Sequence, residues 1–234
     1  MPPATDGAVE AVCFDLDDTL CTYRQRGGDL LASAFADVGV DPFFTAEDYH
    51  ARYSEFVADS EDVRDLRANC FAAIAHDRGR DPETGRAVAR AYAAERDHRA
   101  VDPLPGALEA VERLREDHAV ALVTNGDPGM QGQKLDALGL ADAFEAVVHA
   151  GYDTPPKPEP DPFHHALDEL AVAPDRAVHV GNSLHSDVPG AKRAGLRAVW
   201  YAGGDVGDAS DPDVAPDYRL DSMHELLEPP WVRG

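Results

Sequence analysis

The sequence predicts an α/β protein with a doubly wound, Rossmann-like parallel sheet as its core and an inserted α-helical cap domain. Short apolar runs alternate with stretches of helical periodicity from about residue 101 onward, which is the pattern of βαβ units. One further apolar run near the N-terminus is separated from them by a long stretch of helical character. We therefore expect a core domain of residues 1–20 and 101–234 and a cap domain of residues 21–100.

The first predicted strand is the apolar run Val12–Phe14, which leads directly into acidic residues. Because side chains alternate along an extended chain, Asp15 and Asp17 are expected to point to the same side. Open α/β sheets bind ligands beyond the carboxyl ends of their strands. Two acids there either bind a hard cation or divide nucleophile and proton-transfer roles, and the alternative is an ordinary turn after a strand.

Residues 21–100 have apolar residues at helical spacing, interrupted by glycines and by Asp81-Pro82. This pattern predicts about four helices and no strand. Because the segment follows the acidic strand directly, we expect it to cover the carboxyl end of the sheet as a cap. A passive flank of the core is the alternative.

The remaining chain alternates between the two kinds of element. Helices are expected at 105–117, 128–138, 162–170 and 189–194, and strands at 119–123, 146–149, 177–180 and 198–201. Right-handed connections between such strands produce a doubly wound sheet. An acidic loop beyond Gly203, a short strand at 218–220 and a closing helix near Leu226 complete the prediction.

The charge balance is strongly acidic, with 21 basic and 44 acidic residues and a formal charge of −23. Such a surface repels nucleic acid and anionic membranes, so neither is expected as a partner. Three of the basic residues are lysines, and the acids are dispersed along the chain. Dispersed acidity with few lysines is typical of salt-adapted proteins, in which high salt screens self-repulsion; an acidic binding face is the alternative.

Other features of the composition predict a cytoplasmic location. The N-terminus, beginning Met1-Pro2-Pro3, lacks the basic and apolar segments of a signal peptide, and no stretch approaches 18 uncharged apolar residues. The three cysteines have no metal-binding spacing and cannot all pair, which suits a reducing compartment. The composition leaves monomer and homodimer open.

Polar residues follow three of the predicted strands, and their ends share one edge of a parallel sheet. These residues are Asp15, Asp17, Thr124, Asn125, Asn182 and Asp187, joined by Lys157 from a proline-rich loop. Oxygen ligands, neutral donors and one cation are what a magnesium-bound phosphate requires. Taken singly, Thr124 and Asn125 could merely cap a helix, and Lys157 could be a surface lysine. His179 and His185 are interpreted as structural.

These residues resemble the motifs of the haloacid dehalogenase superfamily of hydrolases. The segment from Asp15 to Leu20 resembles its first motif, and the second and third resemble Thr124-Asn125 and Lys157. The segment from Gly181 to Asp187 resembles the fourth, metal-binding motif. The resemblance implies that Asp15 is the nucleophile and Asp17 the general acid/base. It also implies phosphate binding by Thr124, Asn125 and Lys157.

The fourth motif departs from the family pattern, because Asn182 stands where an aspartate is usual. The resemblance implies Mg²⁺ as cofactor, with Asp15, Asp17, Asn182 and Asp187 as ligands. An amide oxygen can bind magnesium but brings no charge, so either Asp187 supplies the charge or the affinity is lower.

The expected activity is hydrolysis of a phosphomonoester of a small metabolite by a magnesium-dependent enzyme, through an aspartyl-phosphate. A 2-haloacid dehalogenase is the first alternative, because the substituted fourth motif also occurs in that branch. Asp17 argues against it, since displacement of a halide needs no proton donor. A phospho-accepting signalling domain is the second alternative. Tyr23, Arg24, Arg64 and Arg67 are candidates for contact with the substrate.

Overall fold

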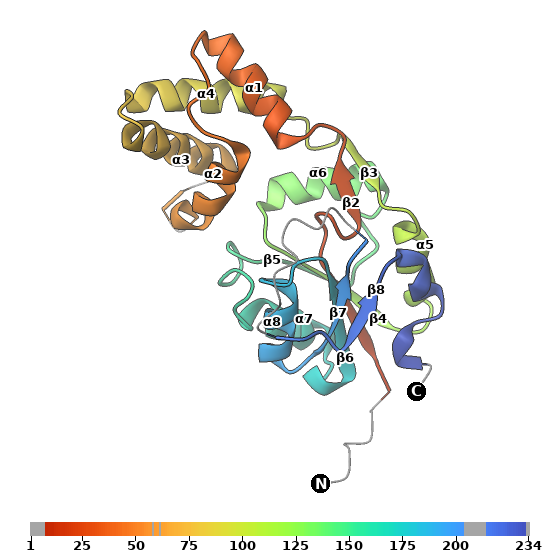
Figure 1. Ribbon diagram of the computed structural model, residues 1–234. Helices are drawn as coiled ribbons and strands as arrows, with labels where there is room; N and C mark the ends of the chain where they lie inside the picture. The colour runs from red at the N-terminus through yellow and green to blue at the C-terminus, as the bar shows by residue number, and fades with distance from the viewer. Residues whose placement is uncertain (1–7, 58, 61, 204–213, 233–234) are drawn as a thin grey trace. The chain divides into compact units, whose positions relative to one another are not determined.

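The computed structural model describes residues 8–57, 59–60, 62–203 and 214–232. It contains a six-stranded parallel sheet in the order β5-β4-β1-β6-β7-β8 (Figure 1). The strands are β1 (Ala11–Phe14), β4 (Ala119–Thr124), β5 (Ala146–His149), β6 (Ala177–Gly181), β7 (Arg197–Tyr201) and β8 (Tyr218–Leu220). The predicted doubly wound parallel sheet is confirmed.

Strand β1 lies in the interior of the sheet between β4 and β6, where Phe14 is in register with Leu122 and Val180. All four of its residues are buried. A parallel strand covered on both faces requires an uninterrupted apolar run, which is what Ala-Val-Cys-Phe provides. Because β1, β4 and β6 run in parallel and in register, the residues that follow them emerge at the same edge.

Helices cover both faces of the sheet. Helices α7 (Asp161–Leu170) and α8 (Asp187–Ala194) pack on one face, where Phe163 and Val188 join Cys13 and Val123 in a single apolar cluster. Right-handed connections place α5 (Ala107–Leu114) and α6 (Pro128–Leu138) on the other face. The sheet is therefore shielded from water on both sides, as all-parallel sheets are.

Helix α6 has well-defined ends that agree with its predicted limits. Asp127 accepts a hydrogen bond from the backbone of Met130, and Pro128 occupies the first turn. Gly139 ends the helix with φ 72°, in the left-handed region that glycine adopts without strain. These caps fix the stretch of chain that carries Gln131 and Lys134, both of which are buried.

The chain divides into two compact units, Met1–Thr22 with Val101–Gly234, and Tyr23–Ala100. The second unit contains α1 (Gly27–Val38), α2 (Ala46–Arg52), the 3-10 helix η1 (Tyr53–Phe56), α3 (Val63–Asp77) and α4 (Pro82–Glu95). The expectation of four helices is confirmed for the described residues. Aromatic rings fill its core, and the rings of Phe44 and Phe71 lie 4.7 Å apart in an edge-to-face arrangement.

Several short elements differ from the sequence predictions. Strands β2 (Cys21–Tyr23) and β3 (Val101–Pro103) form a separate two-stranded sheet that the apolar pattern did not indicate. Each is three residues long, which is too short to establish a period of two. The closing element near Leu226 is a 3-10 helix, η3 (Met223–Leu227), followed by a shorter one, η4 (Pro230–Val232). A further 3-10 helix, η2 (Pro174–Arg176), leads into β6.

Within the described ranges, no helix is both long and apolar enough to cross a membrane. Two sequence predictions lie outside those ranges: the character of residues 1–7 and most of the acidic loop beyond Gly203.

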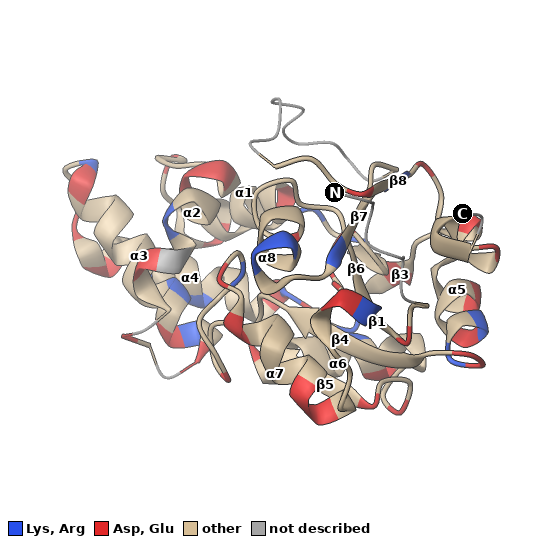
Figure 2. Ribbon diagram, turned by 90° about the horizontal axis from the view of Figure 1, so that it is seen from below, with Lys and Arg blue, Asp and Glu red and all other residues tan. Residues whose placement is uncertain are grey.

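Acidic residues are distributed over helices and connecting loops of both units, with Lys and Arg interspersed (Figure 2). Some arginines pair with them, as Arg113 does with Asp117 at 2.7 Å. Exposed pairs of this kind contribute about 0–1 kcal/mol each to stability. With 44 acidic and 21 basic residues in the sequence, negative charges exceed positive charges by 23.

The packing of α3 against α4 yields a first prediction, since a Cβ at Gly85 would lie 2.2 Å from the carbonyl oxygen of Phe71. Gly85→Ala should lower the free energy of unfolding by about 1–3 kcal/mol, because the two backbones must separate. Gly28→Ala in α1 is the matched control, because no atom lies within 4 Å of its Cβ position. Urea denaturation measures both, and equal stability of the two variants would contradict the packing argument.

Candidate active site

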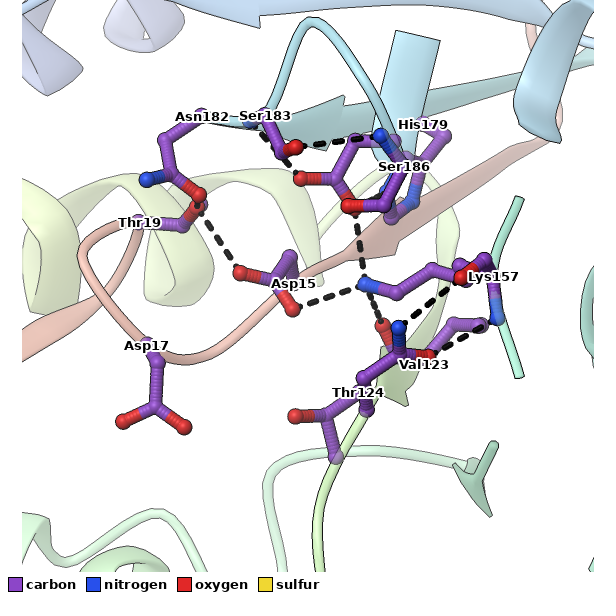
Figure 3. Close-up of polar contacts among 12 residues, drawn as sticks. Asp15, Asp17, Thr19, Val123, Thr124, Lys157, His179, Asn182, Ser183 and Ser186 are labelled. Carbon is purple, nitrogen blue, oxygen red and sulfur yellow. Dashed lines mark hydrogen bonds and ion pairs between the residues drawn. The ribbon is translucent and has the colours of Figure 1, made fainter. Parts of the chain in front are cut away.

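Lys157 lies at the centre of the candidate site, in the loop between β5 and α7 (Figure 3). Its Nζ donates to Asp15 Oδ1 at 2.8 Å, to Asp187 Oδ1 at 2.7 Å and to the carbonyl of Val123 at 2.7 Å. An ammonium group has three donors, so all of them are used. Because only 2% of the side chain is exposed, its charge is stabilised by two carboxylates in place of water.

The two carboxylates bound to Lys157 differ in their electrostatics. Burial raises the pKa of Asp15 well above its ordinary value, because Lys157 only partly offsets the loss of water and Asp187 adds a like charge. Burial acts in the same direction on Asp187, but Lys157 and His179 outweigh it and lower the pKa of Asp187. Asp187 is therefore the stable anion, and Asp15 is the one that a further cation would stabilise most.

Asp187 is fully engaged by donors from its surroundings. Its Oδ1 also contacts His179 Nε2 at 3.0 Å, and its Oδ2 accepts the backbone N–H of Ser183 at 2.9 Å. Burial lowers the pKa of His179, which keeps the ring neutral near pH 7. A Cβ at Gly181 would lie 2.3 Å from the Asp187 carboxyl carbon, so the glycine makes room for this carboxylate. Asp187 therefore orients Lys157.

Asn125 fixes the backbone of the loop that carries Lys157. Its Oδ1 accepts from the backbone N–H of Lys157 at 2.9 Å, and its Nδ2 donates to the Lys157 carbonyl at 3.0 Å. The sequence predicted Asn125 as a phosphate ligand. Its side-chain amide spans both backbone groups of Lys157 and so places that residue, while a contact of Asn125 with phosphate stays a prediction.

The second oxygen of Asp15 lies in a different environment. The hydroxyl of Thr19 is 3.1 Å from Asp15 Oδ2 and 3.3 Å from Asn182 Oδ1. A hydroxyl has a single hydrogen, so it can bond fully to only one of these acceptors at a time. Asp15 and Asn182 thus present neighbouring hard oxygens with unused lone pairs, a donor set that suits Mg²⁺.

The side chain of Asp17 belongs to a separate group and points away from Lys157 (Figure 3). Its Oδ1 accepts from Lys134 Nζ at 2.5 Å and its Oδ2 from Gln131 Nε2 at 2.9 Å. The partial burial of Asp17 acts to raise its pKa, but its contacts with Lys134 and Gln131 outweigh that effect and lower the pKa. The same Gln131 nitrogen donates to Thr124 Oγ1 at 2.7 Å.

These contacts change the interpretation of the predicted metal ligands. Among the described residues, no group of three or more His, Cys, Asp and Glu side chains is arranged to bind a metal ion. The carboxylates of Asp17 and Asp187 are bonded to protein donors through both oxygens. Asp15 is likewise bonded through both oxygens, to Lys157 and Thr19, so all four predicted metal ligands stay predictions. Asp15 and Asn182 are the two whose side-chain oxygens lie next to each other, on either side of the Thr19 hydroxyl.

Four residues in this network were not predicted from the sequence: Thr19, Gln131, Lys134 and His179. Gln131 and Lys134 lie within a helix, where polar residues are ordinary. Lys134 is one of three lysines in the sequence, and this scarcity was a usable signal for it. The apolar neighbours of His179 in β6 indicate burial but not its partner.

The haloacid dehalogenase-like hydrolase family model matches residues 9–195. The match runs from just before β1 to the end of α8 and includes every residue described in the site. The chain therefore belongs to the haloacid dehalogenase-like hydrolases, and the resemblance seen in its motifs is confirmed.

Two curated relatives are phosphatases with different substrates. The chain is 38% identical over 162 residues to phosphoserine phosphatase of Thermus thermophilus, a match covering 69% of this chain and 64% of that protein. It is 31% identical over 229 residues to glyceraldehyde 3-phosphate phosphatase of Methanopyrus kandleri, covering 94% and 96% of the two chains. The match to the Thermus protein thus spans slightly less than two thirds of that relative.

A similar solved structure carries the name of the other branch of the family. The crystal structure of 2-haloacid dehalogenase from Pseudomonas syringae pv. Tomato matches with a TM-score of 0.66 and 27% identity, covering 94% of this chain and 97% of that one. The overall fold is therefore shared by both branches, and the choice between the two reactions depends on individual residues.

The shared lysine yields a second prediction. Lys157→Met should lower the free energy of unfolding at pH 7 by about 3–5 kcal/mol, because two buried carboxylates lose their cation. Wild-type Asp187 has a lowered pKa, so its stabilising effect is present above its ordinary pKa and is lost as the pH falls through the lowered one. In the variant, Asp15 and Asp187 should have pKa values above those of the unfolded chain. The variant should therefore gain stability as the pH falls and these acids take up protons. The stability difference between the two proteins should therefore shrink from pH 7 to pH 4.

Lys192→Met is the control for this measurement by urea denaturation. Lys192 pairs with Asp217 at 2.7 Å, but both side chains are about one third exposed, 34% and 30%. Its loss should cost less than about 1 kcal/mol with little pH dependence. Equal, pH-independent effects of the two substitutions would contradict the described role of Lys157.

Proposed function

We propose that this chain is a magnesium-dependent phosphomonoester hydrolase that acts on a small phosphorylated metabolite through an aspartyl-phosphate. The observation that carries the proposal is the buried contact of Lys157 with Asp15, beside a second acid, Asp17, that has separate partners. Two phosphatase-named relatives support the same class of substrate.

Asp15 would act as nucleophile, with one carboxylate oxygen forming a bond to phosphorus while the bond from phosphorus to the leaving alcohol oxygen breaks. Lys157 reduces the repulsion between the carboxylate and an anionic substrate. Mg²⁺, bound by Asp15 and Asn182, would supply additional positive charge at the phosphoryl oxygens. Burial raises the pKa of Asp15, so a bound cation would be needed to favour its ionised, nucleophilic form.

Asp17, which the lowered pKa keeps ionised in the free protein, would first take up a proton from solvent when the anionic substrate binds and then give it to the leaving alcohol. The carboxylate left behind would accept a proton from the water that cleaves the acyl phosphate. Its side chain is 40% exposed, whereas that of Asp15 is 9% exposed, so water can reach Asp17. This acid also favours phosphate over a haloacid, because a departing halide requires no proton.

Thr124 would donate its hydroxyl hydrogen to a phosphate oxygen. Gln131 already donates to Thr124 Oγ1, and the nitrogen of an amide cannot accept a hydrogen bond in return. The hydroxyl hydrogen is therefore directed elsewhere, as a phosphate ligand requires. Lys157 is the proposed charged contact: on substrate binding one of its three hydrogen bonds would pass to a phosphate oxygen, and Asn125 places the lysine for this.

The helical unit, residues 21–100, would act as a cap domain that selects the leaving group and limits the access of water. The specificity of such a unit depends on its own surface, and the relatives differ in substrate, from phosphoserine to glyceraldehyde 3-phosphate. We therefore propose the substrate only as a small phosphorylated metabolite.

The activity test is a phosphate-release screen over phosphorylated metabolites at molar potassium chloride, with and without Mg²⁺. Asp15→Asn should abolish turnover, and Asp17→Asn should reduce the rate on the order of 10² to 10⁴-fold. Wild-type activity in Asp15→Asn would disprove the mechanism.

The dehalogenase alternative has one observation in its favour, the neutral Asn182 next to Asp15 in a fold shared with a 2-haloacid dehalogenase. Chloride release from 2-chloropropionate in the absence of Mg²⁺, with no phosphate released from the metabolite panel, would establish that reaction instead.

We also propose that the protein works in the cytoplasm of a salt-rich cell. Its formal charge of −23 produces self-repulsion, and Cys13, Cys21 and Cys70 are all free, as in a reducing compartment. The midpoint of thermal unfolding should rise between 0.1 M and about 1 M KCl, because the screening length falls from about 10 Å to 3 Å. A midpoint that does not change would argue against salt adaptation.

A further inference from the structure

Two residues of α6 lie beneath the predicted proton-transfer group and were assigned no role by its motifs. Gln131 and Lys134 are one helical turn apart, and their exposed fractions are 0% and 1%. Between them they bond to both oxygens of Asp17, at 2.9 Å and 2.5 Å. We propose that this pair, the α6 pair, positions Asp17 for proton transfer and, through Gln131, orients Thr124 toward the phosphate. The inference rests on the proposed function.

The orientation of the Gln131 amide is set by its partners. An ionised carboxylate only accepts hydrogen bonds, so the amide nitrogen must face Asp17 Oδ2. The same nitrogen uses its second hydrogen on Thr124 Oγ1 at 2.7 Å. One NH₂ group thus links the acid proposed to move the proton with the hydroxyl proposed to bind phosphate. A change in the position of Gln131 would displace both.

This arrangement leaves one buried polar atom without a hydrogen bond, which costs folding free energy. Gln131 Oε1 is buried and has no hydrogen-bond partner among the described residues. Rotating the amide by half a turn would place Oε1 next to the Asp17 carboxylate, where two acceptor oxygens repel each other. An unsatisfied buried carbonyl is rare in proteins, and its presence here indicates that the two donated hydrogen bonds determine the choice of residue.

Gly126 provides the space that Gln131 occupies. A Cβ at this position would lie 2.4 Å from Gln131 Nε2 and 2.8 Å from its Cδ. The backbone after β4 therefore approaches the amide more closely than any other residue type allows. The glycine of the Thr124-Asn125-Gly126 segment is explained by this contact.

Lys134 supplies the second bond and a charge. A lysine can reach Asp17 from inside the helix packing, whereas the planar guanidinium of arginine needs more room. Lys134 is 1% exposed and bonded to Asp17, so it would act through Asp17 and not by touching a bound phosphate. Lys134 is a positioning residue. Its substitution should therefore reduce the rate most for substrates whose leaving group needs a proton from Asp17.

Comparing substrates whose leaving groups do or do not need a proton shows whether the α6 pair positions Asp17 or only stabilises the fold. Lys134→Met and Gln131→Leu should lower kcat/KM for alkyl phosphates by about 10²-fold, as a misplacement near 1 Å does. For 4-nitrophenyl phosphate, whose leaving group departs without protonation, Lys134→Met should lower kcat/KM less than about threefold. Gly126→Ala should reproduce the effect of Gln131→Leu. Equal losses for both substrate types would overturn the proposal.

Two matched controls and a double variant complete the kinetic test. Gln133→Leu changes a neighbouring glutamine of α6 whose amide donates to the Gly129 carbonyl, and Lys192→Met removes a lysine far along the chain. Both should leave kcat/KM unchanged. Adding Lys134→Met to Asp17→Asn should cause no further loss, because the positioned group is already missing. Multiplied losses would show an independent role.

A structural readout keeps the proposal testable if the wild-type protein releases no phosphate, the outcome that would overturn the proposed function itself. Crystal structures of Gln131→Leu and Lys134→Met should show the Asp17 carboxylate in a new rotamer or in several. An unchanged Asp17 in both would overturn the positioning role. If the wild type is active and Asp15→Asn is not, a failure of the leaving-group test affects only the α6 pair.

Discussion

One ammonium group between two buried carboxylates is the constraint on which the site depends. Lys157 contacts Asp15, which follows β1, Asp187, at the start of α8, and the carbonyl of Val123 in β4. Three neighbouring strands must be in register for these oxygens to converge on one nitrogen. The parallel sheet provides that register. Asn125 then fixes the backbone of the loop that carries Lys157, and Asp187 fixes its ammonium group.

Much of this architecture could be predicted from the chain, because the physical signals are local. Each strand of four or more residues is composed mostly of apolar residues, and α6 has a proline at its start and a glycine after its end. The three-residue strands β2 and β3 carry no such signal, since their pairing depends on chain segments about 80 residues apart. Asp15 and Lys157 were predicted because strand ends meet at one edge of a parallel sheet.

The parts of the site that could not be predicted depend on where a side chain points and not on where its residue lies in the chain. Extended geometry suggested that Asp15 and Asp17 point to the same side, but β1 ends at Phe14 and Asp18 has φ 56°. The turn therefore sends Asp17 to α6 while Asp15 faces Lys157. Spacing along α6 shows that Gln131 and Lys134 share a helix face, but not which group that face contacts. Hydrogen-bond partners across more than 100 residues leave no local pattern.

The chain has three lysines, and the environments of their amines differ sharply. Those of Lys134 and Lys157 are buried against carboxylates, with side chains 1% and 2% exposed, while Lys192 is 34% exposed. An amine-directed reagent applied to the folded protein would therefore modify the side chain of Lys192 and spare the other two. A fluorophore or a solid support could be attached at that one lysine without modifying the candidate active site.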